Sequence, residues 1–304
     1  METLKIPEEK FSMFFTKTSQ GKSFARHRTA AVKGFMSHDF SFHETLALIL
    51  PARLSPLHVS LMPRYRNFLK EKSEEEISSF MEKNYPGMFQ DIDGEDRFEF
   101  AYEIVVMDQY NFKRFLKPDS IVISAGANIG VASIFASRLA SSGRVYVFEP
   151  VRKTFDILKK NVRGFSGIFP FNEGLGDKEK DGNILTSSRS SGMNAMSDSV
   201  LAVTNKKYFD GTERVHTTTI DYFVKKQNIP RVDFIKIDTE GYEAKILTGA
   251  TETIKKWKPT IAMSAYHMKD DKKDLPELLK EICADYVCEL HSDAEEDLIC
   301  YVKK

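Results

Sequence analysis

From about residue 115 to the end of the chain, short apolar runs rich in β-branched residues alternate with segments of helical periodicity. Short apolar runs predict buried strands, and apolar residues three and four positions apart predict helices. Strands joined by helices imply right-handed crossovers, and hence a mainly parallel sheet with helices on both faces. The predicted strands are residues 120–125, 144–148, 168–171, 232–237 and 260–264, and the predicted helices are residues 128–140, 155–162 and 239–254.

The C-terminal residues depart from this alternation. Residues 286–290 and 298–302 are apolar runs around a polar segment, which predicts an antiparallel hairpin at one edge of the sheet. The same stretch holds all three cysteines, Cys283, Cys288 and Cys300. An odd number without CxxC spacing supports neither a disulfide framework nor a zinc site, so buried free thiols are predicted.

The first part of the chain has irregularly spaced apolar residues and long polar runs, and we predict two regions, residues 1–100 and residues 101–304. Residues 64–84 have the spacing of an amphipathic helix, and many phenylalanines lie among basic residues in the first forty positions. Such a mixture can bind single-stranded nucleic acid, but a small helical layer with inward-packed rings is favoured. Residues 1–100 are therefore predicted to be mainly helical and to serve acceptor recognition or self-association into a homo-oligomer.

The chain carries 44 Lys and Arg against 44 Asp and Glu, so its formal net charge is zero. The chain therefore lacks the large excess of positive charge that attracts nucleic acid or an anionic membrane, and neither is predicted as a partner. The N-terminal sequence lacks the basic start and unbroken apolar run of a secretory signal, and no segment reaches the roughly 20 apolar residues of a membrane span. The expected location is the cytoplasm.

The sharpest local signal is AGANIG at residues 125–130, which leads from the first predicted strand into the first predicted helix. Glycine permits a tight turn and close approach of a ligand, and the free N–H groups at a helix start attract negative groups. Dinucleotide sites usually show GxGxxG, whereas three residues separate Gly126 from Gly130. The loop, which also holds Ala127 and Asn128, is therefore better suited to a smaller ligand without a pyrophosphate.

Acidic residues follow the next two strands. Glu149 comes 23 positions after Gly126 (149 − 126), at the carboxyl end of the neighbouring strand. A carboxylate there can accept both hydroxyl hydrogens of a ribose. Asp177 follows the third strand and is placed to reach an adenine amino group. The order of loop, Glu149 and Asp177 therefore predicts a nucleoside ligand.

At these residues the sequence resembles the FkbM-type branch of S-adenosylmethionine-dependent methyltransferases. The likeness is carried, in order, by GANIG at 126–130, VFEP at 147–150, TID at 219–221, IKIDTEGYE at 235–243 and LTGA at 247–250. It extends from about residue 102 to the C-terminus. The resemblance implies a Rossmann-like α/β fold with a seven-stranded, mostly parallel sheet, S-adenosyl-L-methionine as cofactor, and O-methylation of a hydroxyl on a sugar or small natural product.

One departure from the family concerns Ser124, which ends the first strand where the family often has an aspartate. That acid helps to hold the amino-acid moiety of the cofactor, so Glu103 or Asp238 would compensate, or the affinity is weak or the activity has drifted. The predicted cofactor-binding residues are Glu103, Ser124, Gly126, Ala127, Asn128, Gly130, Phe148, Glu149, Leu175, Asp177 and Asp238.

Three residues beside the predicted cofactor site are candidates for the chemistry. Asp238 closes the fourth strand, Glu240 lies two positions on, and His267 follows the fifth strand. A hydroxyl acceptor needs alignment with the methyl group and a base within hydrogen-bond reach. We predict that Asp238 positions the cofactor or acceptor and that His267 is the base.

Each candidate has a structural alternative. Asp238 also suits a helix cap, Glu240 also suits orienting Lys236 or its own loop, and a lone histidine is more often structural. A divalent ion between Asp238 and His267 is disfavoured because no third ligand is evident, so no metal site is predicted.

Residues 187–205 are rich in Ser, Asn, Gly and Met, which indicates either a lid over the acceptor or a mobile surface loop. The main hypothesis is a small-molecule or saccharide O-methyltransferase. One rival is an NAD-dependent oxidoreductase, which the GxxxG spacing disfavours. Another is a non-catalytic cofactor-binding or assembly protein with a degenerate methyltransferase fold, which Ser124 keeps open. The neutral charge argues against a nucleic-acid methyltransferase.

Overall fold

The computed structural model describes residues 100–106, 108–188, 190–199, 202, 206–291 and 295–303. The predictions made for residues 1–99 lie outside this part of the chain, so the helical character of the N-terminal region stays a prediction. Among the described residues, no helix combines the length and the apolar character that a membrane span requires.

The main sheet has seven strands in the order β10-β11-β9-β8-β1-β2-β3. Strands β9, β8, β1, β2 and β3 are parallel, whereas β11 is antiparallel to both β9 and β10. The structure therefore confirms the predicted parallel sheet and the C-terminal hairpin. The strand bounds are β1 Ile121–Ala125, β2 Arg144–Phe148, β3 Ile168–Phe171, β8 Phe234–Ile237, β9 Thr260–Ser264, β10 Tyr286–His291 and β11 Asp297–Val302.

The register of the parallel strands brings their carboxyl ends level. Ala125, the last residue of β1, pairs with Phe148 at the end of β2 and with Ile237 at the end of β8. Ile237 in turn pairs with Met263, near the end of β9. The segments that follow these strands therefore emerge side by side at one edge of the sheet, where α/β folds bind their ligands.

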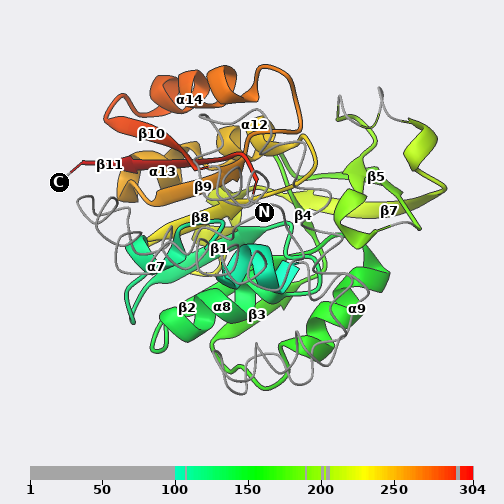
Figure 1. Ribbon diagram of the computed structural model, residues 1–304, viewed down its shortest axis with the longest axis horizontal. Coiled ribbons are helices and arrows are strands. Elements are labelled where there is room, and N and C mark those ends of the chain that lie inside the picture. The colour runs from blue at the N-terminus through cyan, green and yellow to red at the C-terminus, as the bar shows by residue number, and fades with distance from the viewer. Residues whose placement is uncertain are drawn as a thin grey trace, which may run out of the picture. The chain divides into compact units, whose positions relative to one another are not determined.

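Side chains alternate between the two faces of the sheet and bury two helical layers. In β1, Ile121 and Ile123 belong to one apolar core, and Val122 belongs to the other. Figure 1 shows α12, α13 and α14 on one side of the sheet and α7 and α8 on the other. The α-helices are α7 Phe112–Phe115, α8 Val131–Leu139, α9 Arg152–Asn161, α11 Ile220–Lys226, α12 Glu243–Thr248, α13 Thr251–Trp257 and α14 Asp271–Ile282, with a π-helical turn at Tyr102–Val106 and 3-10 turns at Ser191–Met193 and Lys206–Tyr208.

The helix predicted over residues 239–254 is wrong in its extent, because the chain forms two helices, α12 and α13, with a break at Gly249. A side chain at Gly249 would lie 1.9 Å from the backbone oxygen of Gly176, so this turn must pack against that loop. The carboxylate of Asp221 then accepts hydrogen bonds from the backbone N–H groups of Glu252 and Thr253, at 2.9 and 2.8 Å. These bonds satisfy the free donors at the start of α13 and fix the new helix direction.

A second, smaller sheet was not predicted. Its four strands follow the order β4-β7-β5-β6, with bounds Gly174–Leu175, Lys180–Thr186, Ala195–Met196 and Gly211–Thr218 for β4 to β7. Strands β5 and β7 form a long antiparallel pair, which lies at the right of Figure 1. This sheet carries Ile184 and Met196 into the apolar core.

The cysteine prediction is wrong for two of the three residues. Cys288 of β10 and Cys300 of β11 form a disulfide, while Cys283 is free and half-buried. The two cysteines are directly opposite in the hairpin register, with Cα atoms 4.0 Å apart. The odd number of cysteines and the lack of CxxC spacing carry no information about such a cross-strand disulfide, because only the strand register brings the two cysteines together.

Candidate functional site

A pocket lies at the carboxyl edge of the parallel strands and is lined by residues of both sheets. It has about 650 Å³ of free space, including solvent at its mouth. The segments after β1, β2 and β8 contribute Gly126, Glu149 and Asp238, which the sequence analysis had placed at one sheet edge. The structure thus brings these three predicted residues together in one site.

The glycine loop owes its shape to close backbone packing. Gly126 has a φ of +69°, and a side chain there would lie 1.8 Å from the backbone oxygen of Asp238. Only glycine combines this left-handed conformation with such an approach. The loop is held further by Lys236, which is 2% exposed and donates hydrogen bonds to the carbonyl oxygens of Ala125 and Gly126 at 3.2 and 2.6 Å. Lys236 was not predicted as a site residue, although it lies within the IKIDTEGYE motif.

Glu149 lies in the pocket wall and is only 6% exposed. One of its carboxylate oxygens accepts the backbone N–H of Asn128 and the other accepts the N–H of Val151, both at 3.0 Å. Burial raises the pKa of Glu149 to about 7, although these N–H groups and Lys236 favour the charged form. Since each carboxylate oxygen can accept more than one hydrogen bond, Glu149 retains acceptor capacity for a ligand.

The wall around Glu149 is apolar. Phe148 and Leu175 come from the ends of β2 and β4, and Ile184 and Met196 come from the smaller sheet. Sequence reasoning missed Ile184 and Met196 because it did not predict the sheet that carries them. Phe148 and Leu175 had been predicted as cofactor-binding residues, and both line the pocket.

The segment predicted as a lid or surface loop contributes to the pocket. Ser191 donates a hydrogen bond from its hydroxyl to Oδ1 of Asn128 at 2.7 Å, which ties this segment to the glycine loop. Gly192 and Asn194 also line the pocket. Residues 189, 200, 201 and 203–205 lie outside the described part of the chain, and any closing movement stays a prediction.

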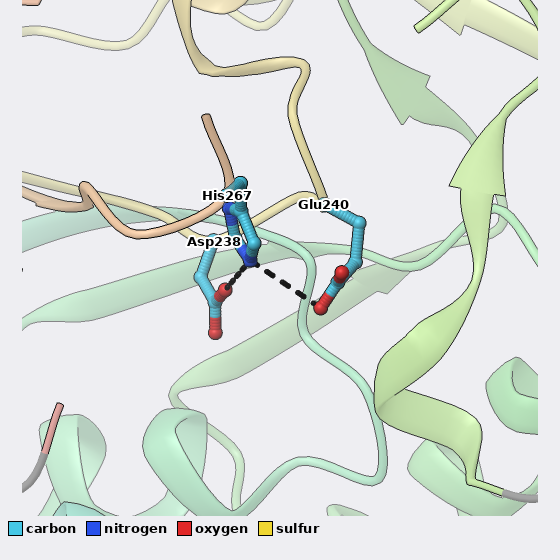
Figure 2. A group of neighbouring side chains, drawn as sticks. All are labelled: Asp238, Glu240 and His267. Carbon is cyan, nitrogen blue, oxygen red and sulfur yellow. Dashed lines mark ion pairs between the residues drawn. The ribbon is translucent and has the colours of Figure 1, made fainter. Parts of the chain in front are cut away.

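Asp238 and Glu240 line the pocket and form a cluster with His267, which lies behind them and is not in the pocket lining (Figure 2). The imidazole Nε2 of His267 lies 3.4 Å from Oε1 of Glu240 and 3.9 Å from Oδ1 of Asp238. Asp238 does not cap the next helix, because α12 begins at Glu243, which is five residues further on (243 − 238). The structure therefore brings the three predicted catalytic residues together, with Glu240 as a neighbour that the metal argument had not considered.

Tyr110 and Lys236 hold one oxygen of Asp238. The Tyr110 hydroxyl donates to Oδ2 at 2.9 Å, and the ammonium group of Lys236 lies 3.5 Å from the same oxygen. Burial raises the pKa of Asp238, but Lys236, His267 and the Tyr110 hydrogen bond outweigh this and lower it overall. Asp238 is therefore a fixed, ionised carboxylate at neutral pH.

Three carboxylates surround the imidazole of His267, namely those of the buried Glu243 and of the partly exposed Asp238 and Glu240. Burial by itself lowers the pKa of His267, but Glu240 and Glu243 raise it to about 11. The imidazole of the free protein is therefore protonated at neutral pH, and a protonated imidazole cannot accept a proton from a hydroxyl. These surroundings do not suit the predicted role of His267 as a base.

Glu240 has a backbone conformation that L-residues rarely adopt. Its φ is +55°, and Gly241 follows with a φ of +86°. Such strain is typically stored where a side chain must be aimed at a functional site. Glu240 lines the pocket, and burial raises its pKa.

The other predicted cofactor-binding residues do not line the pocket. Gly130 precedes α8, and a side chain there would lie 2.8 Å from Leu158, so its role is packing. Ala127 is buried, and Glu103 lies in the π-helical turn. The side-chain oxygen of Ser124 and Oδ1 of Asp177 are buried and have no hydrogen-bond partner among the described residues.

Comparison with known proteins identifies the family of the chain. The family model of the methyltransferase FkbM domain matches residues 124–292. The chain is 30% identical over 166 residues to the hexuronic acid methyltransferase AglP of Haloferax volcanii, which is 54% of this chain and 62% of that protein. It is 23% identical over 182 residues to methyltransferase sdnD of Sordaria araneosa, covering 51% of this chain and 69% of that one.

Among solved structures, the methyltransferase FkbM from Methylobacillus flagellatus KT matches 73% of this chain and 60% of its own, with 18% identity and a TM-score of 0.47. The chain thus spans less than two thirds of AglP, and the match to the family model extends over more than half of the chain. The protein is therefore a member of the FkbM methyltransferase family.

Proposed function

We propose that this methyltransferase uses S-adenosylmethionine and methylates a hydroxyl group of a sugar or another small natural product. The observation that carries the proposal is one pocket that is lined by Glu149 and apolar side chains and also by Asp238 and Glu240. The similarity to AglP, a hexuronic acid methyltransferase, supports a sugar acid as the acceptor class.

The residues present fit the proposed cofactor. Glu149 has acceptor capacity for two ribose hydroxyls, and Leu175, Ile184 and Met196 supply apolar contacts for an adenine ring. Asp238 lines the pocket where Glu103 does not, so we assign to Asp238 the compensation for Ser124. When bound, the sulfonium group of the cofactor supplies an activated methyl group for direct displacement.

The protein's own residues would bind and orient the acceptor. The oxygens of Asp238 and Glu240 can accept a hydrogen bond from a hydroxyl in the pocket, and Tyr110 and Lys236 keep Asp238 in place. Holding a hydroxyl in line for transfer is worth roughly 7–11 kcal/mol of the barrier. Accepting its proton contributes on the order of 10²–10⁴ in rate.

The test combines cofactor binding with methyl transfer. S-adenosylhomocysteine and NAD are titrated calorimetrically, and labelled methyl transfer is measured with hexuronic-acid saccharides and with RNA as acceptors. We expect binding of S-adenosylhomocysteine, no binding of NAD, and transfer to the saccharides. Binding of NAD alone, or transfer to RNA alone, would contradict the proposal.

Two variants separate cofactor binding from methyl transfer. Glu149→Ala should weaken S-adenosylhomocysteine binding, whereas Asp238→Asn should lower methyl transfer by about 10² or more. Glu252→Gln is the matched control, because the side chain of Glu252 is 80% exposed. If Glu149→Ala binds the cofactor product as well as the parent does, the ribose assignment is wrong.

A further inference from the structure

The imidazole of His267 is buried and held in one orientation, and one of its two nitrogens makes no hydrogen bond among the described residues. Its side chain is 3% exposed, and its Nδ1 lies 3.2 Å from Oε1 of Glu243. The same Glu243 oxygen accepts the backbone N–H of Thr239 at 2.9 Å and its hydroxyl at 3.1 Å, so Glu243 is fixed. Because a carboxylate only accepts hydrogen bonds, Nδ1 keeps its proton, and Nε2 is the nitrogen from which a cation would displace the second proton.

Nε2 has no hydrogen-bond partner among the described residues. It is aimed at two carboxylates, those of Asp238 and Glu240, as Figure 2 shows. The two oxygens of Asp238 are divided between different neighbours. Oδ2 is held by Tyr110 and Lys236, whereas Oδ1 faces Nε2.

The spacing of these atoms suits a shared ion. Ligand atoms about 2.1 Å from one ion lie about 3.0 Å apart at right angles and about 3.4 Å apart in a tetrahedron. Nε2 lies 3.4 Å from Oε1 of Glu240 and 3.9 Å from Oδ1 of Asp238, and one ligand atom from each of the three residues lies within 4.8 Å of the others. Small side-chain rotations therefore suffice to complete the coordination.

The charge balance also suits a divalent cation. Three carboxylates surround His267, and one ammonium group, that of Lys236, offsets one of them. With a neutral imidazole, two negative charges remain (3 − 1 = 2). The hydrogen bond from Nδ1 to Glu243 is the arrangement that orients histidine ligands in metal sites.

We propose that Asp238, Glu240 and His267 bind a divalent cation of the first transition row, such as Mn²⁺ or Zn²⁺. A mixed set of one imidazole and two carboxylates favours these ions over Mg²⁺ and Ca²⁺, which take oxygen ligands. Three protein ligands leave further positions open towards the pocket, which Asp238 and Glu240 line. Provided that the proposed function holds, the ion would bind an oxygen of the acceptor and stabilise its negative charge as its proton passes to the oxygen of Glu240 that does not bind the ion.

Mn²⁺ binding by the complete 304-residue chain after chelator treatment tests the site directly. Electron paramagnetic resonance measures it without activity, because the signal of the free ion disappears on binding. We expect one tight site in the wild type, weakened at least 100-fold in Glu240→Gln and in His267→Gln. Glu243→Gln, which removes only the orienting carboxylate, should weaken binding about 10- to 100-fold.

His216→Gln is the matched control. His216 is exposed, and its Nδ1 also pairs with a carboxylate, that of Asp181 at 3.0 Å, but it lies outside the pocket. This variant should bind Mn²⁺ as the wild type does. Should His267→Gln fail to fold, as judged by thermal unfolding, Glu240→Gln decides, because Glu240 lies in a partly exposed loop.

The outcomes separate this site from the proposed function. Three results would each overturn the metal site. They are no Mn²⁺ binding by the wild type, equal binding by wild type and Glu240→Gln, and displacement of Mn²⁺ by equimolar Mg²⁺. This holds even if S-adenosylhomocysteine binds in the calorimeter and methyl transfer proceeds. A metal site that behaves as expected in a chain that does not bind S-adenosylhomocysteine would instead contradict the proposed function alone.

Discussion

Replacing Glu149 with glutamine is expected to remove a pH dependence of cofactor binding between pH 6 and pH 8. In the free protein, burial raises the pKa of Glu149 to about 7. Ribose hydroxyls donate hydrogen bonds, so they favour the charged carboxylate and return its pKa towards the ordinary value of about 4.3. Binding should therefore release a proton, and affinity should rise with pH and level off above pH 7.

The size of the effect follows from the ionised fraction. With a pKa of about 7, roughly one molecule in eleven is ionised at pH 6 and about ten in eleven at pH 8. The apparent dissociation constant scales with the inverse of the competent fraction, so it should be about tenfold weaker at pH 6 than at pH 8. This corresponds to about 1.4 kcal/mol.

Calorimetric titration of S-adenosylhomocysteine at pH 6, 7 and 8 and constant ionic strength measures the effect. Titration in two buffers of different ionisation enthalpy should show about half a proton released at pH 7. In Glu149→Gln the pH dependence that Glu149 causes should vanish, and the comparison cancels any titration of the ligand itself. Affinities within twofold across this range, or the same tenfold change in the variant, would refute the reasoning.

Three further perturbations test the packing around the site. Gly126→Ala should destabilise the fold by about 1–3 kcal/mol, because its side chain would meet the backbone of Asp238 at a positive φ; an unchanged urea midpoint would contradict this. Tyr110→Phe removes a buried donor from the charged Asp238 and should cost about 1.5–3 kcal/mol in the same assay; a loss below about 0.5 kcal/mol would show that the hydrogen bond does not form. A reductant should lower the free energy of unfolding by up to about 3 kcal/mol, because it breaks the Cys288–Cys300 disulfide, which spans 12 positions. It should not change the free energy of unfolding of Cys288→Ala, and equal responses of the two proteins would show that the disulfide is absent.

The sequence was informative wherever local pattern decides structure. Apolar, β-branched runs such as residues 121–125 became strands because both faces of a parallel sheet are buried. The order of Gly126, Glu149 and Asp238 along the chain also predicted a common site. Level strand ends bring together whatever follows them, so this prediction needed no knowledge of side-chain packing.

Features that depend on long-range register were out of reach. The smaller sheet pairs residues 180–186 with 211–217, and these strands are half-exposed with few apolar residues, so they carry little periodic signal. The disulfide of Cys288 and Cys300 depends on the hairpin register alone. Glu240 was predicted as a site residue but not as a neighbour of His267, because its left-handed backbone conformation cannot be predicted from the sequence pattern.

Buried charges were equally hard to predict. Lys236 occurs in a strand whose other residues are apolar, and only the structure shows that its ammonium group holds the glycine loop and Asp238. The pKa of His267 depends on carboxylates from a distant part of the chain, and without them a histidine base was the natural expectation. In both cases the decisive interaction joins elements that only the fold brings together.

A crystal structure of the protein with S-adenosylhomocysteine tests the central claim most directly. We expect ribose hydroxyls within hydrogen-bond distance of the Glu149 carboxylate and the sulfur atom beside Asp238. Ligand density at another place on the molecule, or an adenosine beside Asp238 instead of Glu149, would contradict this expectation.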